Sequence, residues 1–115
     1  MLTQELLLQK FTTVLKQRCP QLSSLLQYCH IELVNHHWGQ PPKVSLHFVV
    51  YSPNNLFTEV STYKPIFREV ANNLGIPEAI CMNATRIISD RASTLKERNL
   101  VLWLELQWIV TQHLE

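Results

Sequence analysis

The sequence predicts an α+β fold: an antiparallel sheet of about four or five strands, with an N-terminal helix and a central helix packed on one side of it. Residues 3–18 repeat apolar side chains at helical spacing, whereas residues 43–51 alternate apolar and polar side chains. No strand is clearly followed by a crossover helix and a parallel strand. With 115 residues, the chain suffices for one domain, and we expect a single domain over residues 1–115.

Two helical segments are expected at the start of the chain. Thr3 can cap a helix that runs to about Arg18, and Pro20 ends this helix at or near Cys19. A short second helical segment follows at residues 21–28. The apolar face of the first helix comprises Leu7, Leu8, Phe11, Val14 and Leu15.

A β-hairpin is expected next, because the apolar pattern changes to period two at Ile31. Residues 31–36 form one strand and residues 43–51 the other. The turn between them contains Gly39, which can adopt positive φ, and two prolines, which fix φ. The second strand directs one set of alternate residues to the core: Val44, Leu46, Phe48 and Val50.

The centre of the chain allows two interpretations. Residues 56–63 suit a third strand, but their apolar residues would also form a helical stripe. Because Pro65 is natural in the first turn of a helix, we prefer an extended segment followed by a helix over residues 65–74, which Gly75 ends. Residues 78–89 alternate in character, which favours a further strand over a helix for this segment.

The most apolar segment is residues 100–111. Its polar residues Glu105 and Gln107 stand two apart, which favours a strand over a helix. A C-terminal helix remains the alternative for this segment.

Composition argues against several classes of function. The net charge of +1 is too small for a strongly basic nucleic-acid binder, and two glycines cannot build a phosphate-binding loop. Three cysteines without a C-x-x-C pair indicate reduced thiols. Neither a secretory signal nor a membrane-spanning run is visible. We therefore expect a cytoplasmic, non-enzymatic protein without a cofactor.

Two groups of residues support alternative functions. His36 or His37 could approach His47 across the hairpin and bind a metal ion, as in a metal-dependent enzyme, although solvent-facing histidines explain the pattern equally simply. A basic cluster leaves a small nucleic-acid-binding protein as the other alternative; it comprises Arg86, Arg91, Lys96 and Arg98.

A surplus of apolar residues on the second face of the predicted sheet is the strongest functional indication. If helices cover only one face, this surplus forms a patch that a second copy or another protein must cover; helices on both faces are the alternative. Tryptophan and tyrosine are typical of such interfaces, and Glu105 could accept hydrogen bonds or a basic side chain. The candidate partner-binding residues are Trp38, Tyr51, Trp103, Glu105 and Trp108.

The expected order of a helix, a three-strand meander, a helix and two strands resembles small dimeric bacterial chaperones of the secretion-chaperone type. The segments that carry it are residues 3–18, 31–63, 65–74 and 78–111. The resemblance implies a homodimer that presents a groove or a sheet edge to a peptide segment of a client protein. Those chaperones are usually acidic and usually end in a helix, in contrast to this near-neutral chain. Size and general style also resemble assembly chaperones of bacterial microcompartment shells such as the carboxysome, which would make a shell protein the client.

Overall fold

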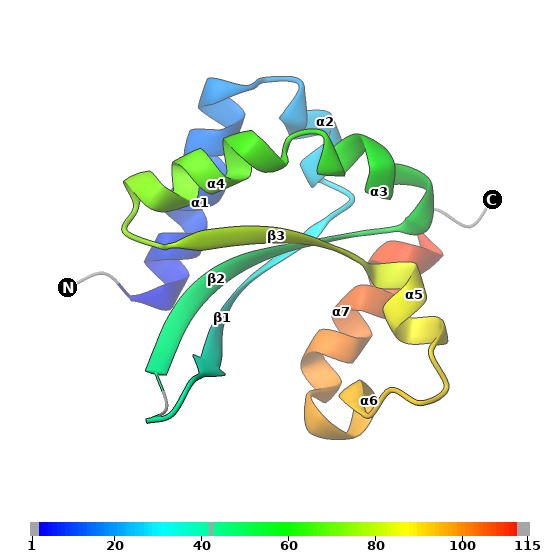
Figure 1. The fold of residues 1–115 in the computed structure, drawn as a ribbon. Coiled ribbons are helices and arrows are strands. Elements are labelled where there is room, and N and C mark those ends of the chain that lie inside the picture. The colour runs from blue at the N-terminus through cyan, green and yellow to red at the C-terminus, as the bar shows by residue number, and fades with distance from the viewer. Residues whose placement is uncertain (1–2, 42, 113–115) are drawn as a thin grey trace.

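The computed structural model describes residues 3–41 and 43–112, and it has an α+β fold (Figure 1). In these residues the elements follow in the order α1 (Gln4–Arg18), α2 (Leu22–Leu26), β1 (His30–Trp38), β2 (Lys43–Ser52), α3 (Asn54–Ser61), α4 (Lys64–Asn73), β3 (Glu78–Asn83), α5 (Ala84–Ser89), α6 (Leu95–Arg98) and α7 (Leu100–Thr111). The strands form one sheet in the order β1-β2-β3. The sheet is mixed and has three strands, so the prediction of four or five antiparallel strands was wrong.

Local signals located α1 and the hairpin correctly. The Thr3 hydroxyl caps α1 by accepting a hydrogen bond from the amide of Leu6 at 3.2 Å. β1 and β2 pair antiparallel without a break, from His30 opposite Tyr51 to the end of the hairpin, and Gly39 adopts φ +80° in the turn. Val44 was expected in the core but is 59% exposed, because the end of the hairpin projects beyond the helices (Figure 1).

A crossover joins β2 to β3, which the sequence did not reveal. α3 and α4 carry the chain across one face of the sheet, so that β3 pairs parallel to β2. Residues 54–61 are therefore helix and not the preferred third strand. The helical stripe was the better interpretation: Val60 is fully buried, and Pro65 occupies the first turn of α4.

Gly75 ends α4, as predicted. Its φ of +82° lets the amide of Ile76 bond the carbonyl of Ala71 at 2.9 Å, while its own amide bonds Asn72 at 3.0 Å. This is the Schellman pattern, which turns the chain from α4 into β3.

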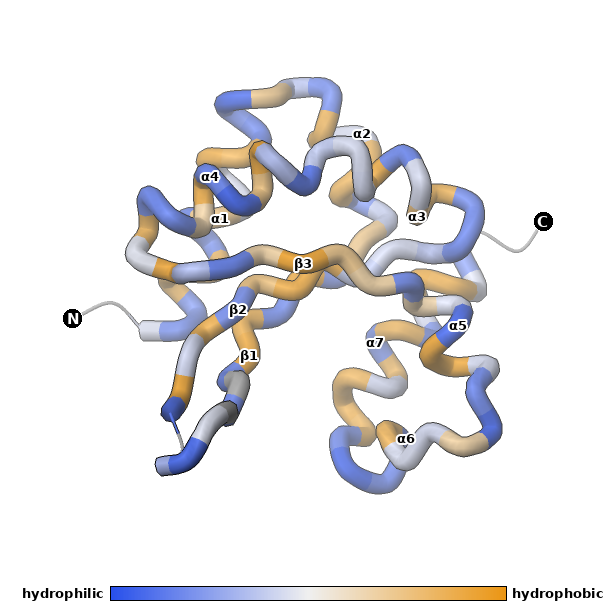
Figure 2. Tube along the Cα trace, viewed as in Figure 1, coloured by the Kyte–Doolittle hydropathy of each residue, from blue (hydrophilic) through white to orange (hydrophobic). Residues whose placement is uncertain are grey.

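The C-terminal third is mainly helical. The strand predicted over residues 78–89 is correct only for β3, since Asn83 caps α5 through a hydrogen bond from the amide of Arg86. The predicted strand over residues 100–111 is the helix α7, whose cap Asn99 accepts from the amide of Leu102 at 3.1 Å. Because nearly every residue of α7 is apolar, both a period of two and a helical period fit it (Figure 2).

Helices cover both faces of the sheet, so the expectation that they lie on one side was wrong. A first core joins α1, α2 and α4 to one face, and in it the rings of Phe11 and Phe48 stack with centroids 4.0 Å apart. A second core joins α5 and α7 to the other face. The buried residues of the second core are Val49, Tyr51, Ala84, Leu102, Leu106, Ile109 and Val110.

Within the described residues, each helix is too short or too polar to span the hydrocarbon layer of a membrane.

Candidate functional site

The five residues predicted to bind a partner do not all lie on one surface of the fold. Tyr51 is only 6% exposed and belongs to the second core, while Trp103 is half-buried on α7. Glu105 and Trp108 are exposed on α7. Trp38 ends β1 opposite Lys43, and its side chain lies outside the described part of the structure. The structure thus places two of the five on one exposed surface.

β1 presents an open edge. It lies at the margin of the sheet, and among the described residues only β2 pairs with it. No backbone group of the described helices and loops bonds to its other edge. Natural sheets usually blunt such an edge with proline, lysine or a bulge. β1 contains neither residue, and its register with β2 is continuous over nine pairs.

β3 forms the opposite margin and is better protected. It has six residues against nine in β1, and α5 follows it directly. Glu78 at its start accepts hydrogen bonds from the amide of Ala79 and from Arg68, whose Nε lies 2.8 Å away. This arrangement holds the pKa of the Glu78 carboxyl below its usual value, mainly through the hydrogen bond from Arg68.

A polar cluster marks the start of β1. The Nε2 atom of His30 lies 2.7 Å from Glu32 Oε1, and Nδ1 lies 3.8 Å from Glu105 Oε2. The ring of His30 also lies beside that of Tyr51, with centroids 6.2 Å apart. Burial raises the pKa of Tyr51, and the charge of Glu32 raises it further. Tyr51 therefore stays neutral beneath the cluster.

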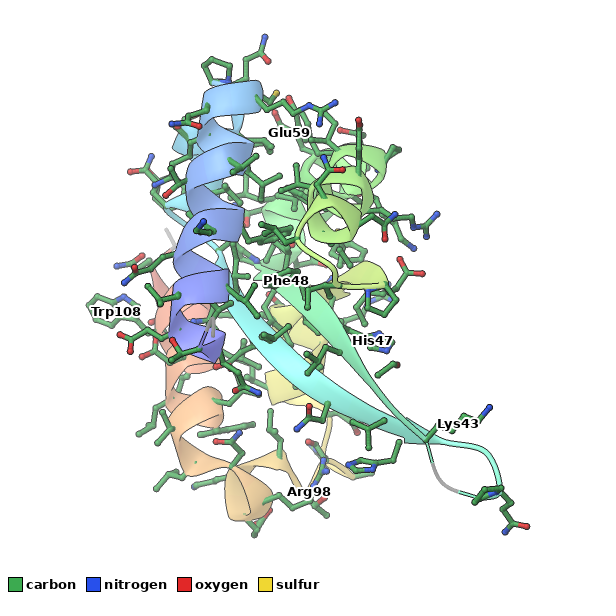
Figure 3. The ribbon with its side chains drawn as sticks, turned by 90° about the vertical axis from the view of Figure 1, so that its left-hand side faces the viewer. Lys43, His47, Phe48, Glu59, Arg98 and Trp108 are labelled. Carbon is green, nitrogen blue, oxygen red and sulfur yellow. The ribbon has the colours of Figure 1, made fainter. Side chains whose placement is uncertain are left out.

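The outer face of α7 carries the largest exposed apolar side chains of the C-terminal helices. Leu100, Val101, Leu104 and Trp108 are 52%, 72%, 54% and 62% exposed, and we call them the α7 stripe. Trp108 points away from the body of the molecule (Figure 3). The opposite side of α7 is buried in the second core. The exposed side of α7 also carries the polar residues Glu105, Gln107 and Thr111, so the four residues of the α7 stripe are large apolar side chains on an otherwise polar, solvent-facing surface.

The histidine metal site, which the sequence left as an alternative, gains no support from the described residues. His37 pairs with Val44 and His47 with Val34, so the two histidines lie on opposite faces of the hairpin; the side chain of His36 is outside the described part. The side chains that are described include no group of three or more His, Cys, Asp or Glu able to hold a metal ion.

Cys29 and Cys81 are placed as unreactive thiols. Burial raises the pKa of Cys29 to about 12, with a smaller contribution from Cys81. The pKa of Cys81 is itself raised by burial. A thiol with a raised pKa is a poor nucleophile at neutral pH, because the thiolate is the reactive form.

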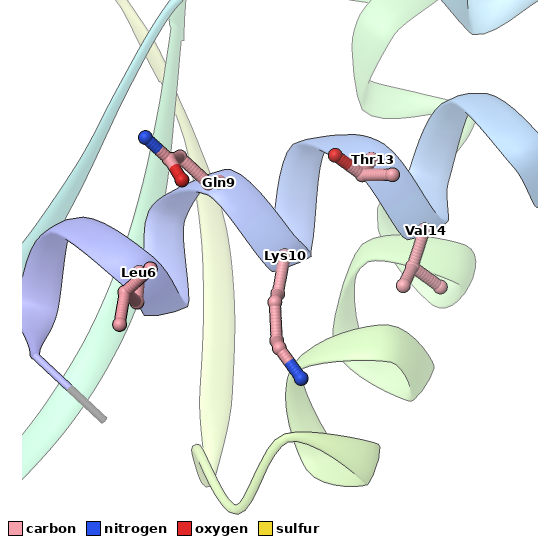
Figure 4. A pocket seen from close by; sticks show the side chains of 5 residues that line it. All are labelled: Leu6, Gln9, Lys10, Thr13 and Val14. Atoms are coloured by element: carbon pink, nitrogen blue, oxygen red, sulfur yellow. The ribbon is translucent and has the colours of Figure 1, made fainter. Parts of the chain in front are cut away.

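Two further surface features carry no chemistry of their own. A hollow of about 400 Å³ on α1 is lined by Leu6, Gln9, Lys10, Thr13 and Val14 (Figure 4). All of them belong to one helix, whereas ligand sites collect polar groups from several elements. The basic residues Arg86, Arg91, Lys96 and Arg98 form no ion pair within the described structure.

Sequence reasoning missed the open edge, because the position of a strand in a sheet depends on the crossover and not on the strand itself. The sequence did contain a signal for α7: residues 100–111 are too long for an ordinary strand and follow a capping asparagine.

Comparison of the chain with protein-family models, with curated proteins and with solved structures gave no match.

Proposed function

We propose that this protein is a non-enzymatic protein-binding module, an adaptor or assembly chaperone that takes an extended segment of a client protein onto the open edge of β1. One observation carries the proposal: β1 is a nine-residue edge strand without proline or lysine, and no other described element bonds to its outer backbone edge. A segment added to such an edge gains main-chain hydrogen bonds, while its alternate side chains provide specificity.

The side chains of β1 indicate which client segment would fit. On the side of the first core, the half-buried Ile31 would lie beside an apolar residue of an added strand. On the other side, Glu32 and the half-exposed Glu105 favour polar or basic residues. We therefore expect a client segment that alternates apolar residues with polar or basic ones.

Two expectations from the sequence, the cytoplasmic location and the shell-protein client, bear on this proposal. The free thiols of Cys19, Cys29 and Cys81 fit a reducing compartment such as the cytoplasm. The order of helices and strands differs from the order on which the chaperone resemblance was based, so a microcompartment shell protein is only one of the clients that an experiment could identify.

Affinity capture with edge variants tests the proposal. Neighbouring residues of an antiparallel strand point their amides alternately at the paired strand and outward. Of the variants Val34→Pro and Asn35→Pro, one thus removes a bond to β2 and the other removes an outward donor. The variant that keeps the wild-type thermal transition identifies the outward position.

We expect the wild-type protein to capture one stoichiometric protein from a lysate of its source, and the outward proline variant to lose it. Trp108→Ala, which leaves the edge intact, is the matched control and should retain the client. Capture that survives the outward proline would refute binding at this edge. An eluate that holds nucleic acid or a metal ion in place of a protein would favour the alternative functions.

A further inference from the structure

We infer that the α7 stripe is a self-association surface, on which a second copy of this chain packs its own α7 antiparallel about a twofold axis. This inference concerns a face other than the open edge of β1 and does not depend on client binding. The shape, the charge and the area of the stripe are the three grounds on which we infer that a second copy of this chain covers it.

The shape of the stripe is complementary to itself. Val101, Leu104 and Trp108 follow at i, i+3 and i+7, the spacing of a helix–helix seam. A twofold contact needs one patch that fits its own copy. With the axis near Leu104, an antiparallel arrangement sets the large Trp108 of each copy against the smaller Leu100 and Val101 of the other.

A hollow at the C-terminal end of the stripe fits this arrangement. Leu104, Gln107, Trp108 and Thr111 line a space of about 310 Å³ on α7. In the antiparallel pair, the N-terminal end of the partner's stripe lies over this space. Its aliphatic side chains would fill the hollow, which a bare helix surface leaves to water.

Charge selects the antiparallel direction. Lys96 and Arg98 lie on α6, just before the N-terminal end of α7. Glu97 stands between them, so two positive charges against one negative charge leave this end positive, as the helix dipole is there. The last turn of α7 has no basic residue, so the negative end of its dipole is not neutralised by its own side chains. Antiparallel packing brings each basic end to the negative end of the other helix, whereas parallel packing would bring the two basic ends together.

The area of the α7 stripe limits the affinity that we expect for the dimer. We take the area of the stripe as that of the largest exposed apolar patch on a typical monomer, on the order of 300–600 Å². A stable interface buries roughly 800 Å² on each partner, so the stripe falls below that value. We therefore expect a dimer that dissociates on dilution, with a dissociation constant on the order of micromolar.

Sedimentation of the purified protein tests this, over concentrations from about 1 µM to about 1 mM. The wild type should change from monomer to dimer over that range. Leu104→Glu and Trp108→Glu each replace an exposed side chain and should raise the dissociation constant roughly 30-fold or more. Leu6→Glu is the matched control, because Leu6 is 43% exposed on α1 and should leave the dimer unchanged. Circular dichroism verifies that each variant is folded.

Cross-linking tests the direction. Val101→Cys protein mixed with Trp108→Cys protein should form the mixed disulfide on mild oxidation, as antiparallel packing requires. Disulfides that form only between two Val101→Cys chains would show a parallel pair and overturn the antiparallel geometry. A wild-type protein that stays monomeric at the highest concentration, or a dimer that Trp108→Glu does not weaken, would overturn the inference. Association with a different protein or with anionic vesicles through the same residues would identify another occupant and do the same.

Discussion

His30 stands between two carboxylates from different elements, with Nε2 2.7 Å from Glu32 on its own strand and Nδ1 3.8 Å from Glu105 on α7. The second contact joins the first strand of the sheet to the last helix of the chain. The side chain of Glu105 is 49% exposed, so water and salt weaken its attraction to the imidazole.

A small coupling energy is therefore expected between His30 and Glu105. In a double-mutant cycle of His30→Ala and Glu105→Gln at pH 5, where histidines ordinarily carry a proton, the coupling should be about 0.2–1 kcal/mol. Urea unfolding at low and at high salt measures it, and it should shrink at high salt. A coupling of several kcal/mol, or one that salt does not change, would contradict this weak surface interaction.

The stacked pair of Phe11 and Phe48 should dominate the stability of the first core. Phe11→Ala empties a fully buried site between α1 and the sheet, and we expect the free energy of unfolding to fall by about 3–5 kcal/mol. Phe57→Ala, at a half-buried position on α3, is the control and should cost clearly less. Equal losses in the two variants, measured by urea unfolding, would show that this stack has no special weight.

Cys29 should resist thiol reagents and make the protein sensitive to alkali. Its pKa of about 12 in the folded state lies above the ordinary value of 9.0, so the unfolded chain releases this proton first as the pH rises. The contribution of Cys29 is intact below pH 9 and is lost between pH 9 and 12, by at most about 1.4 kcal/mol per pH unit. Unfolding at pH 8 and 10.5 checks this.

Cys29→Ser is the control for the alkaline loss, since a serine does not titrate there. Its stability should decline less with pH than that of the wild type. Native Cys29, which is half-buried, should also react with a disulfide reagent at pH 8 more slowly than it does in denaturant. Rapid labelling of the native thiol would show that it is neither buried nor protonated as described.

Asn99 should contribute to the stability of α7 as its N-cap. Asn99→Ala removes the side-chain oxygen that accepts from the amide of Leu102, which costs about 0.5–2 kcal/mol. Asn99→Asp keeps an acceptor and should restore most of the loss. Thermal unfolding measures both variants, and an aspartate as damaging as the alanine would argue against a capping role.

Local chemistry explains which elements the sequence could predict. Thr3, Gly39 and Gly75 each satisfy a backbone requirement at a helix start, a turn or a helix end, and each of these boundaries was located correctly. Requirements of this kind depend on only one or two neighbouring residues, so the sequence alone reveals them. The predictions therefore hold for α1, the hairpin and α4.

The parts that could not be predicted depend on tertiary contacts. Residues 78–83 contain no local signal for parallel pairing with β2, because the length and packing of α3 and α4 set that pairing. α7 satisfied two periods at once, and only the cap at Asn99 and its length distinguish helix from strand. Because residues 100–111 form the helix α7, the sheet lacks the last strand that the sequence predicted.

The candidate site also combines features that residue types indicate with features that only tertiary contacts reveal. Glu105 and Trp108 were predicted as partner-binding residues, and both lie exposed on α7. Tyr51 could not be separated from them, because its burial depends on α7 covering the second face of the sheet. The open edge of β1 became visible only with the strand order.

The central position of β2 has a further consequence for the way the protein unfolds. Phe48 and Val50 contribute to the first core, while Val49 and Tyr51 contribute to the second. One strand thus forms a wall of both cores, so neither helical layer can detach without exposing half of β2. We expect the two layers to melt in a single cooperative step, and the amides of residues 48–51 to be among the slowest in the chain to exchange with solvent.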